Sequence, residues 1–423
     1  MPASIPHGSR VTAPRRVVVV GAGMVGLATA WFLQEHGVEV TVVDRDGVAA
    51  GSSWGNAGWL SPVMAIPLPE PSVLRYGLRG LFNVNAPLSM PLTLDPTLWR
   101  FLASFAAHCT MGQWRRAMQG YLAVNREALK AFDLLELAGV ASTTISAPIM
   151  ACFEDGAQSK DLRHELALIE ASGQPVDLTE ISGDGARVIV PQIAQGVRAV
   201  VQINGQRYID PGAFVTSLAD SFIKRGGKVR TGFSVRALRH GPGGITVSGY
   251  GGDPELGDAV VVATGAWLNE LVTPLGVRQR VQAGRGYSFS VSTDEPVANP
   301  IYFPAARVAC TPYREGLRVG GTMEFRSPDH PIVQSRVDAL AASARPLLQG
   351  VDWSTMRDVW VGPRPVSVDG LPLVGGTKVP GVFVAGGHGM WGITLGPITG
   401  QLLAHEIVTG ERPAALDAFN PLR

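Results

Sequence analysis

Three glycines and one aspartate near the N-terminus have the spacing of a dinucleotide-binding site. Gly21, Gly23 and Gly26 match the pattern G-x-G-x-x-G. In that pattern the glycines allow a tight turn, let the backbone approach a pyrophosphate, and permit close packing of a helix on a strand. Asp44 follows about 20 residues later, where a carboxylate can accept hydrogen bonds from the ribose hydroxyls of an adenosine. An acid at this position disfavours NADP and leaves NAD or FAD as the cofactor.

The segments around these residues predict the elements that would position them. Residues 17–20 are four valines, which favours a buried parallel strand. Residues 27–36 continue as a helix whose first N–H groups point at the phosphates, and Gly37 ends it. Residues 38–43 form the next strand, which ends at the aspartate. A strand, a helix and a strand around the glycines make the motif far more specific than the glycines alone.

The alternative for this segment is a signal peptide or a membrane anchor. Arg15 and Arg16 precede an uncharged run that reaches Gln34, a length close to that of a spanning helix. Three glycines within the run, the lack of a small-residue cleavage site and the strand that follows all argue against it. Residues 1–14, rich in Pro, Ser and Gly, are expected to be a disordered leader.

The composition indicates a soluble protein of more than one domain. A chain of 423 residues predicts about two or three domains. Its 36 basic and 35 acidic side chains give a net charge of +1, so nucleic acid is not an expected partner. Cys109, Cys152 and Cys310 are far apart and have no metal-ligand spacing, which fits a reducing compartment and predicts three small buried side chains.

Residues 50–62 carry the signal that separates NAD from FAD. They read AGSSWGNAGWLSP, a stretch of small residues and hydroxyls suited to backbone that runs beside a diphosphate and a flat ring. Together with the N-terminal glycine motif and the C-terminal block described below, this stretch resembles the D-amino-acid oxidase superfamily of FAD enzymes. Within it, the chain is most similar to the small subunit of the bacterial D-amino-acid dehydrogenases. The resemblance extends from Arg16 to Gly410.

The resemblance implies FAD as the cofactor, bound non-covalently. Dimethylglycine-type relatives carry a flavin-linked His where this chain has Gly55, and the sarcosine-oxidase branch uses a C-terminal Cys, whereas no Cys follows Cys310. The residues expected to contact FAD are Gly21, Ala22, Gly23, Met24, Val25, Gly26, Asp44, Arg45, Ser52, Ser53, Asn56, Ala57, Gly58, Leu60, Val235, Ala263, Thr264, Gly265, Trp267, Gly387, His388, Gly389, Gly392, Ile393 and Thr394.

The middle of the chain predicts helices and then a return to nucleotide-binding elements. Residues 71–150 have a helical apolar period that includes Leu98, Phe101, Leu102 and Phe105. This face packs either on the protein's own core or on a membrane or quinone. Further along, we expect a helix at 211–224, a strand at 228–238, and a buried strand at 258–263 that ends in the Thr264 turn.

Residues 277–360 alternate in the manner of antiparallel strands, for example at 286–291, 308–313 and 317–322. We expect this sheet to cover the flavin. Tyr287 and Tyr302 are candidates to line the substrate pocket, although a tyrosine with a satisfied hydroxyl also serves as a core residue.

The C-terminal block supplies the residue best suited to bind an amino acid. Arg364 lies in the segment GPRPVSVDGLPLVG, and a guanidinium holds a carboxylate through two parallel hydrogen bonds without losing its charge. In glycine-oxidase-like relatives the matching Arg has this role; the alternative is an anchor to carbonyl groups. A strand at 382–385 then enters a glycine-rich turn and a helix to about residue 408, whose N-terminus favours the negative charge of a reduced flavin. His388 in this turn is expected to contact the flavin mainly through its backbone.

The resemblance predicts the fold, the reaction and the cellular location. The fold is an α/β Rossmann-like FAD-binding domain, built from residues 15–70, 206–276 and 361–423. A second, α+β domain, built from 71–205 and 277–360, binds substrate. The expected reaction is hydride transfer from a D-amino acid, with D-proline and hydroxy-D-proline among the candidates, followed by transfer of electrons to a quinone or another acceptor. We expect a cytoplasmic protein, or one peripheral to the cytoplasmic face of the membrane.

Three hypotheses about the function stay open at this point: a dehydrogenase and two alternatives to it. Sarcosine-type oxidases place a Lys over the flavin where this chain has Arg318, and glycine-oxidase-like enzymes have a Tyr where it has Ala309. Both differences favour a dehydrogenase. An oxygen-using amine, glycine or opine oxidase, and a flavoprotein component of a larger complex, are the alternatives.

Overall fold

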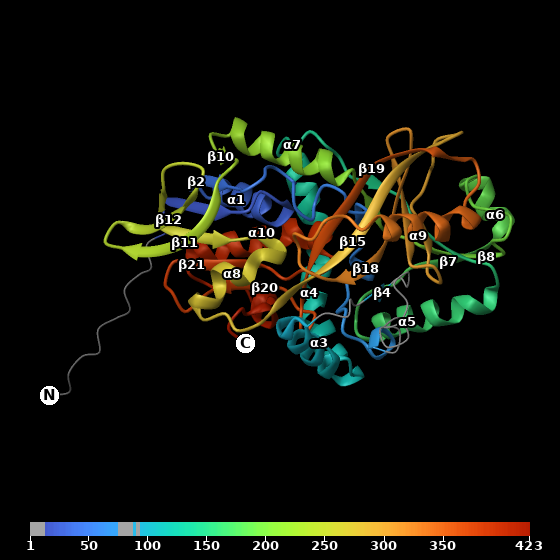
Figure 1. Cartoon of the computed structure of the whole chain (residues 1–423), viewed down its shortest axis with the longest axis horizontal. Helices are drawn as coiled ribbons and strands as arrows, with labels where there is room; N and C mark the ends of the chain where they lie inside the picture. Colours follow the sequence, from blue (N-terminus) through green and yellow to red (C-terminus); the bar gives the residue numbers. More distant parts are fainter. Residues whose placement is uncertain (1–12, 75–87, 90–93) are drawn as a thin grey trace.

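The computed structural model describes residues 13–74, 88–89 and 94–423. Most of the segment expected to be a leader, residues 1–12, lies outside these ranges, so that prediction stays untested. Figure 1 shows two sheets along the long axis of the molecule, one toward its left and one toward its right.

Six strands of the described chain form the sheet at the left of Figure 1. In spatial order they are β10 (Lys228–Arg230), β2 (Glu39–Val43), β1 (Arg16–Val20), β14 (Ala259–Val262), β21 (Val382–Gly386) and β20 (Leu373–Gly376). All neighbours are parallel except β20 and β21. The four valines of β1 are buried because helices cover one face of this sheet and a smaller sheet covers the other. The predicted Rossmann-like architecture is confirmed.

The two faces of this sheet are covered by different kinds of element. One face packs on the helices α1 (Met24–Glu35), α7 (Pro211–Lys224) and α10 (Gly392–Thr409). The other packs on α8 (Leu268–Val272) and on a sheet of β11 (Ser234–Gly241), β12 (Gly244–Tyr250) and β13 (Glu255–Gly257). Helix α7 begins as its sequence predicts, with Pro211 in the first turn and the Asp210 carboxylate accepting from the N–H of Ala213 at 3.1 Å.

The single strand expected at residues 228–238 is wrong. The segment forms two strands in different sheets, β10 and β11. Between them Gly232 has φ +73°, and the N–H of Phe233 donates to the carbonyl of Asp44 at 2.9 Å. The turn lets Phe233 join the core on the far face of the sheet, which an unbroken strand could not do.

The sheet toward the right of Figure 1 has nine described strands. They are β19 (Val351–Ser367), β15 (Val281–Thr293), β18 (Gly316–Phe325), β17 (Val308–Tyr313), β16 (Ile301–Phe303), β6 (Ile149–Phe153), β8 (Ala199–Ile203) and β7 (Leu178–Ser182), with β4 (Leu88–Ser89) beside β18. From β19 to β16 the neighbours are antiparallel, as predicted. Helices α9 (Gln334–Ala344) and α6 (Gly183–Ile189) pack on this sheet, and α5 (Ser159–Ala171) lies beside β8.

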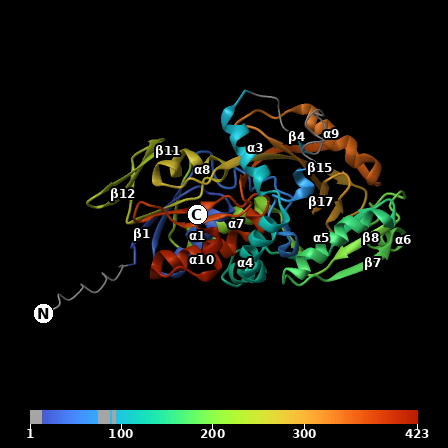
Figure 2. The same cartoon turned by 90° about the horizontal axis from the view of Figure 1, so that it is seen from below.

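Helices α3 (Pro96–His108) and α4 (Met111–Leu137) lie between the two sheets in Figure 2. Leu98, Phe101 and Phe105 of α3 are buried against Phe325 of β18, so this apolar face packs on the protein's own core. Among the residues described, none of the helices combines the length and the apolar character that crossing a bilayer requires. The three cysteines are free and buried, as expected. The division into two domains stays a prediction.

Candidate active site

The turn between β1 and α1 is tight in the way that the glycine pattern predicts. Gly21 has φ +115°, and a Cβ atom there would lie 2.5 Å from the carbonyl oxygen of Ala263. A Cβ atom on Gly26 would lie 2.0 Å from the carbonyl oxygen of Gly21. The N-terminus of α1 therefore sits against the ends of β1 and β14, with no acidic residue in its first turn. Such a helix end attracts an anion such as a pyrophosphate.

The carboxylate of Asp44 is fixed at the end of β2. Its Oδ2 atom accepts from the N–H of Ala22 at 2.8 Å, and its Oδ1 atom accepts from the N–H groups of Asp46 at 2.8 Å and Gly47 at 2.9 Å. These bonds place the carboxylate beside the glycine turn, and it lines a cavity there. Its predicted contact with ribose hydroxyls stays a prediction.

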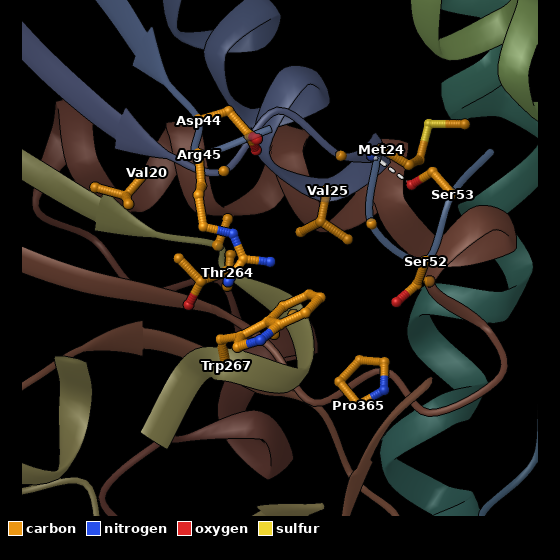
Figure 3. A pocket seen from close by; sticks show the side chains of 18 of the residues that line it. Val20, Met24, Val25, Asp44, Arg45, Ser52, Ser53, Thr264, Trp267 and Pro365 are labelled. Atoms are coloured by element: carbon orange, nitrogen blue, oxygen red, sulfur yellow. Dashed lines mark hydrogen bonds between the residues drawn. The ribbon is translucent and has the colours of Figure 1, made fainter. Parts of the chain in front are cut away.

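This first cavity, of about 250 Å³, opens along the carboxyl ends of β1, β2, β14 and β21. In open α/β sheets this edge is the usual place for a ligand. Figure 3 shows the side chains of Asp44 and Arg45, of the 52–53 segment and of the 264–267 turn around the same space. The predicted FAD contacts that line it are Gly21, Gly23, Met24, Val25, Asp44, Arg45, Ser52, Ser53, Asn56, Val235, Ala263, Thr264, Gly265, Trp267, His388, Gly389, Gly392 and Ile393.

The remaining predicted contacts lie just behind this lining or beside it. Ala57 lines a second cavity, described below. Leu60 is fully buried, and the Thr394 hydroxyl donates to the carbonyl of Trp59 at 2.9 Å. The others hold the backbone in place at close approaches: Ala22, Gly26, Gly58 and Gly387. A supporting position fits these residues better than direct contact with a cofactor.

A stacked pair of side chains forms one wall of the first cavity. The guanidinium of Arg45 lies 4.7 Å from the ring centre of Trp267. Figure 3 shows the two side chains next to each other. The Trp267 ring N–H donates to the Asp329 carboxylate at 3.0 Å, and Arg45 is 3.5 Å from the same carboxylate. Asp329 comes from the segment after β18, so this wall joins the two sheets. The neighbouring carboxylates raise the pKa of Arg45, although burial opposes them, so the group stays cationic.

The wall of the first cavity contains buried polar atoms that have no partner among the described residues. The His388 side chain is 1% exposed, and its Nε2 atom lies 3.0 Å from the hydroxyl of Thr399, whereas its Nδ1 atom has no hydrogen bond. The hydroxyl of Thr264 has none either. Burial lowers the pKa of His388 to about 4, so the ring is neutral at neutral pH. A bound dinucleotide would offer hydrogen-bonding groups where these atoms line the cavity, and the residues therefore fit such a cofactor.

The segment 52–58 is held by the nine-stranded sheet. The Ser52 hydroxyl donates to the carbonyl of Pro363, and the Ser288 hydroxyl donates to the carbonyl of Gly55 at 2.8 Å. The Thr311 hydroxyl donates to the carbonyl of Ala57. Strands β15, β17 and β19 thus fix a loop that belongs to the first cavity.

A second cavity, of about 270 Å³, lies between this loop and the nine-stranded sheet. Its walls are mostly apolar, with Trp59, Met64, Ile66, Trp360 and Trp391 among them. Both cavities are lined by the same four residues where they meet: Ser52, Asn56, Arg364 and Met390. A cofactor in the first cavity and a small molecule in the second would therefore meet beside Arg364.

Arg364 is a half-buried cation that lines both cavities. Its Nη1 atom donates to the carbonyl of Thr322 at 2.7 Å, and no carboxylate of the described chain pairs with it. Burial lowers the pKa of Arg364 to about 10, which leaves it charged at neutral pH. The guanidinium lies over Gly286 of β15, where a Cβ atom would be 2.2 Å from Cζ. A desolvated guanidinium without a counter-ion is the natural receptor for a carboxylate.

The two predicted tyrosines have different surroundings. Both line the second cavity, but the Tyr287 hydroxyl donates to Glu324 at 2.8 Å, and burial together with that carboxylate raises the pKa of Tyr287 to about 12. Its hydroxyl is engaged within the protein. Tyr302 packs edge-to-face on Trp59 with 5.6 Å between ring centres, and burial raises its pKa. Contact of either residue with substrate stays a prediction.

Ala309 and Arg318, the two positions compared with oxidases above, also have different surroundings. Ala309 lines the second cavity. Arg318 lines neither: it is buried between the rings of Trp54 and Tyr313, at 4.8 Å and 4.2 Å from their centres. The guanidinium of Arg318 is thus held by aromatic rings of the protein itself, and its match to the Lys of sarcosine-type oxidases stays a prediction.

The sequence analysis missed several residues of the second cavity. They are Glu70, Glu165, Arg307, Thr322, Trp360, Met390 and Trp391. One signal could have found Glu165: it lies on the buried side of α5, three residues after Leu162 and four before Ile169. A carboxylate on the apolar side of an amphipathic helix is either paired or faces a cavity.

Comparison with known proteins agrees with this geometry. The family model described as DAO, FAD dependent oxidoreductase, matches residues 16–406. A D-amino acid dehydrogenase of Xanthobacter autotrophicus is 30% identical over 405 residues, which cover 94% of this chain and 96% of that protein. Another from Cereibacter sphaeroides is 32% identical over 410 residues, which cover 94% and 92%. Glycine oxidase from Geobacillus kaustophilus has a similar fold, with a TM-score of 0.73 and 21% identity over 97% of this chain and 99% of that one. The chain belongs to the DAO family of FAD-dependent oxidoreductases.

Proposed function

We propose that this protein is an FAD-dependent dehydrogenase of D-amino acids, with D-proline and hydroxy-D-proline among its candidate substrates. The observation that carries the proposal is Arg364, a half-buried cation without an acidic partner in the described chain, at the place where the two cavities meet. The printed names of the two sequence relatives support the substrate class.

Arg364 gives the substrate its orientation. The guanidinium binds the carboxylate of the amino acid, and the carbonyl of Thr322 together with the open face of Gly286 holds the guanidinium in place. The carbon that bears the amine then lies beside the first cavity. FAD, when bound there, accepts a hydride from that carbon. The resulting imino acid takes up water and gives a 2-oxo acid and ammonia, or stays cyclic when the substrate is a proline.

Substrate must lose its ammonium proton before the hydride leaves, and the charged residues of the site favour a substrate whose amine is neutral. Arg364 repels an ammonium group at close range. His388 is held at Thr399 and has a lowered pKa, so it is a weak base. The hydroxyl of Tyr287 is engaged with Glu324. We therefore assign no side-chain base, and water takes the proton.

An acceptor other than oxygen, such as a quinone, fits the chain better. The flavin-facing Lys of sarcosine-type oxidases has no counterpart here, because the chain's only lysines are Lys130, Lys160, Lys224, Lys228 and Lys378, and none lines either cavity. We infer a dehydrogenase that passes its electrons to a separate acceptor.

We expect the FAD to be bound without a covalent link. Neither cavity lining contains a cysteine, and His388, the histidine of these linings, is buried with its Nε2 atom at Thr399. Precipitating the purified protein with acid should release all of the yellow flavin into the supernatant. Flavin that stays with the pellet would contradict this prediction.

The function is tested by mixing the purified holoenzyme anaerobically with single D- and L-amino acids, including D-proline and hydroxy-D-proline. The visible band of oxidised flavin should bleach with D-enantiomers and persist with their L-forms. Bleaching only by glycine or secondary amines, with peroxide formed in air, would indicate an oxidase instead. Retained flavin that no substrate reduces would indicate a component of a larger complex that needs its partner.

A further inference from the structure

The second cavity contains a group of charged side chains that the proposed reaction does not use. Glu70, Glu165 and Arg307 line it together with Tyr302. They come from separate segments: Glu70 precedes the helical residues 71–74, Glu165 lies on α5, and Arg307 follows β16. Arg364 lines both cavities, whereas this charged group lines the second cavity and not the first. The cavity therefore carries two separate sets of charged groups, and much of the rest of its lining is apolar.

Glu165 is the carboxylate of this group that lacks a partner. Within the described part of the chain it has neither a hydrogen bond nor an ion pair, and the half-buried residue lines the cavity. Burial, and then the carboxylate of Glu70, raise the pKa of Glu165 to about 7, and the charge of Arg307 opposes them. A carboxylate in these surroundings gains from a cation or a strong donor placed in the cavity.

Arg307 is already engaged. Its side chain is hydrogen-bonded to the hydroxyl of Tyr302, and the charges of Glu165 and Glu70 raise its pKa against burial. Glu70 accepts from the hydroxyl of Ser72. With both carboxylates ionised, the described charged residues of this group, Glu70, Glu165 and Arg307, carry one negative charge more than they carry positive charges. A ligand group with a positive charge balances it, and a negative one increases the imbalance.

We propose that the second cavity selects D-amino acids whose side chain ends in an amine or a guanidinium group, with the α-carboxylate on Arg364 and the distal cation beside Glu165 and Glu70. The proposal rests on the proposed function, since it uses the same carboxylate receptor. The apolar walls, among them Met64 and Ile66, contact the methylene groups of such a side chain. D-lysine, D-ornithine and D-arginine are the compounds of this chemistry.

An uncharged side chain of equal length makes the same apolar contacts and leaves Glu165 unpaired. D-norleucine has the same four-carbon chain as D-lysine and lacks only the ω-amine, so the pair isolates the effect of the charge. A site built to bind a polar group discriminates strongly against an analogue that lacks it. We expect kred/Kd, from anaerobic stopped-flow reduction of the flavin at pH 8, to be roughly 10- to 100-fold higher for D-lysine than for D-norleucine.

The preference should depend on pH with a definite sign. Glu165 is protonated below its raised pKa and charged above it, so the ratio of D-lysine to D-norleucine rises from pH 6 to pH 8. The groups that face Glu165 are Glu70, Arg307 and Tyr302. The raised pKa of Glu165, about 7, lies in this range. Because the ratio compares two substrates with the same α-amino group, ionisation of that group cancels.

The Glu165→Gln variant tests the assignment directly. It should lower the D-lysine to D-norleucine ratio roughly 10-fold and remove its dependence on pH. Glu170→Gln is the matched control, because Glu170 is exposed on the same helix, and it should leave the ratio unchanged. Glu70→Gln is the second variant at the site and should lower the ratio as well. Flavin content and melting temperature show which variants have folded.

The outcomes separate this proposal from the proposed function. Equal reduction by D-lysine and D-norleucine in the unaltered enzyme, or a better reaction with D-glutamate, overturns the charge preference and leaves the D-amino-acid reaction standing. An unchanged ratio in folded Glu165→Gln also overturns it. No reduction by any D-amino acid overturns both. A high ratio that rises with pH and falls in both variants supports the proposal.

Discussion

Replacement of Arg364 by methionine is expected to slow reduction of the flavin by D-amino acids severely while FAD stays bound. Methionine fills the space of the side chain but cannot pair with a carboxylate. Loss of one partner of a buried charged pair costs about 2–5 kcal/mol, which corresponds to a fall in kred/Kd of roughly 30- to 5,000-fold. The measurement is anaerobic stopped-flow reduction, with the flavin-to-protein absorbance ratio as the test of cofactor retention.

Folding should survive this change. The guanidinium of Arg364 is desolvated, which is why its pKa falls to about 10, and no acid of the described chain compensates it. Removing such a group relieves the folded state of a burial penalty, so the melting temperature should not fall. Arg364→Lys keeps the charge without the planar pair of donors and should recover only part of the rate. Arg239→Met, at an exposed position of β11, is the control. Unchanged reduction in Arg364→Met would contradict the assigned role.

A second variant moves the guanidinium without removing it. A Cβ atom on Gly286 would lie 2.2 Å from both Cζ and Nη2 of Arg364, so Gly286→Ala must displace the group from its position over β15. The charge remains in the cavity, but it no longer lies where a bound carboxylate places the reacting carbon. We expect a smaller loss of kred/Kd than in Arg364→Met. Unimpaired reduction would show that the geometry of the guanidinium matters less than its charge.

Substitution of Gly26 by alanine is expected to weaken FAD binding. The new Cβ atom would lie 2.0 Å from the carbonyl oxygen of Gly21 and 3.3 Å from Cβ of Ala263, so α1 must move away from β1 and β14. Its N–H groups then lose their place beside the pyrophosphate. Crowding of this kind costs about 1–3 kcal/mol, or roughly a 5- to 150-fold rise in the Kd for FAD. The affinity is measured by titrating flavin-free protein with FAD and following flavin fluorescence.

The control for this variant is the same glycine-to-alanine change at a position with free space around it. Gly112 lies near the start of α4, and a Cβ atom there would meet nothing within 4 Å, so Gly112→Ala should bind FAD normally. The melting temperature of the flavin-free protein should fall in Gly26→Ala, because the strain is in the fold itself. If Gly26→Ala bound FAD as tightly as the unaltered protein, α1 could move away from β1 without loss of affinity. That result would contradict the role assigned to the close packing of this turn.

The sequence predicts well those helices and strands that are specified by residues close together in the chain. The valines of β1, the glycine turn and Asp44 specify strand, helix and strand within 30 residues, and the structure has them within a few residues of the predicted limits. Helix α7 has its predicted bounds because Pro211 and the Asp210 cap start it. The break between β10 and β11 was missed, because the reason for it is Phe233, which packs on the far face of the sheet.

The candidate site was predictable to the extent that its residues follow a backbone motif. The first cavity contains eighteen of the predicted FAD contacts, since glycine turns and helix starts have the same local geometry wherever they occur. The hydrogen-bond partner of the Tyr287 hydroxyl was not predictable from the sequence. Whether it faces substrate or Glu324 depends on a residue 37 positions away on a neighbouring strand.

By itself, the sequence determined that this chain binds a dinucleotide at the edge of a parallel sheet, and its resemblances narrowed the cofactor to FAD. These conclusions depend on contacts between residues close in the chain. Only the tertiary structure decided what faces the cofactor. It brings Arg364 of β19 over Gly286 of β15 and places Glu165 of α5 in the same cavity, across 199 residues of sequence. Long-range packing sets the separation and burial of such charges, and the proposed substrate preference rests on these two quantities.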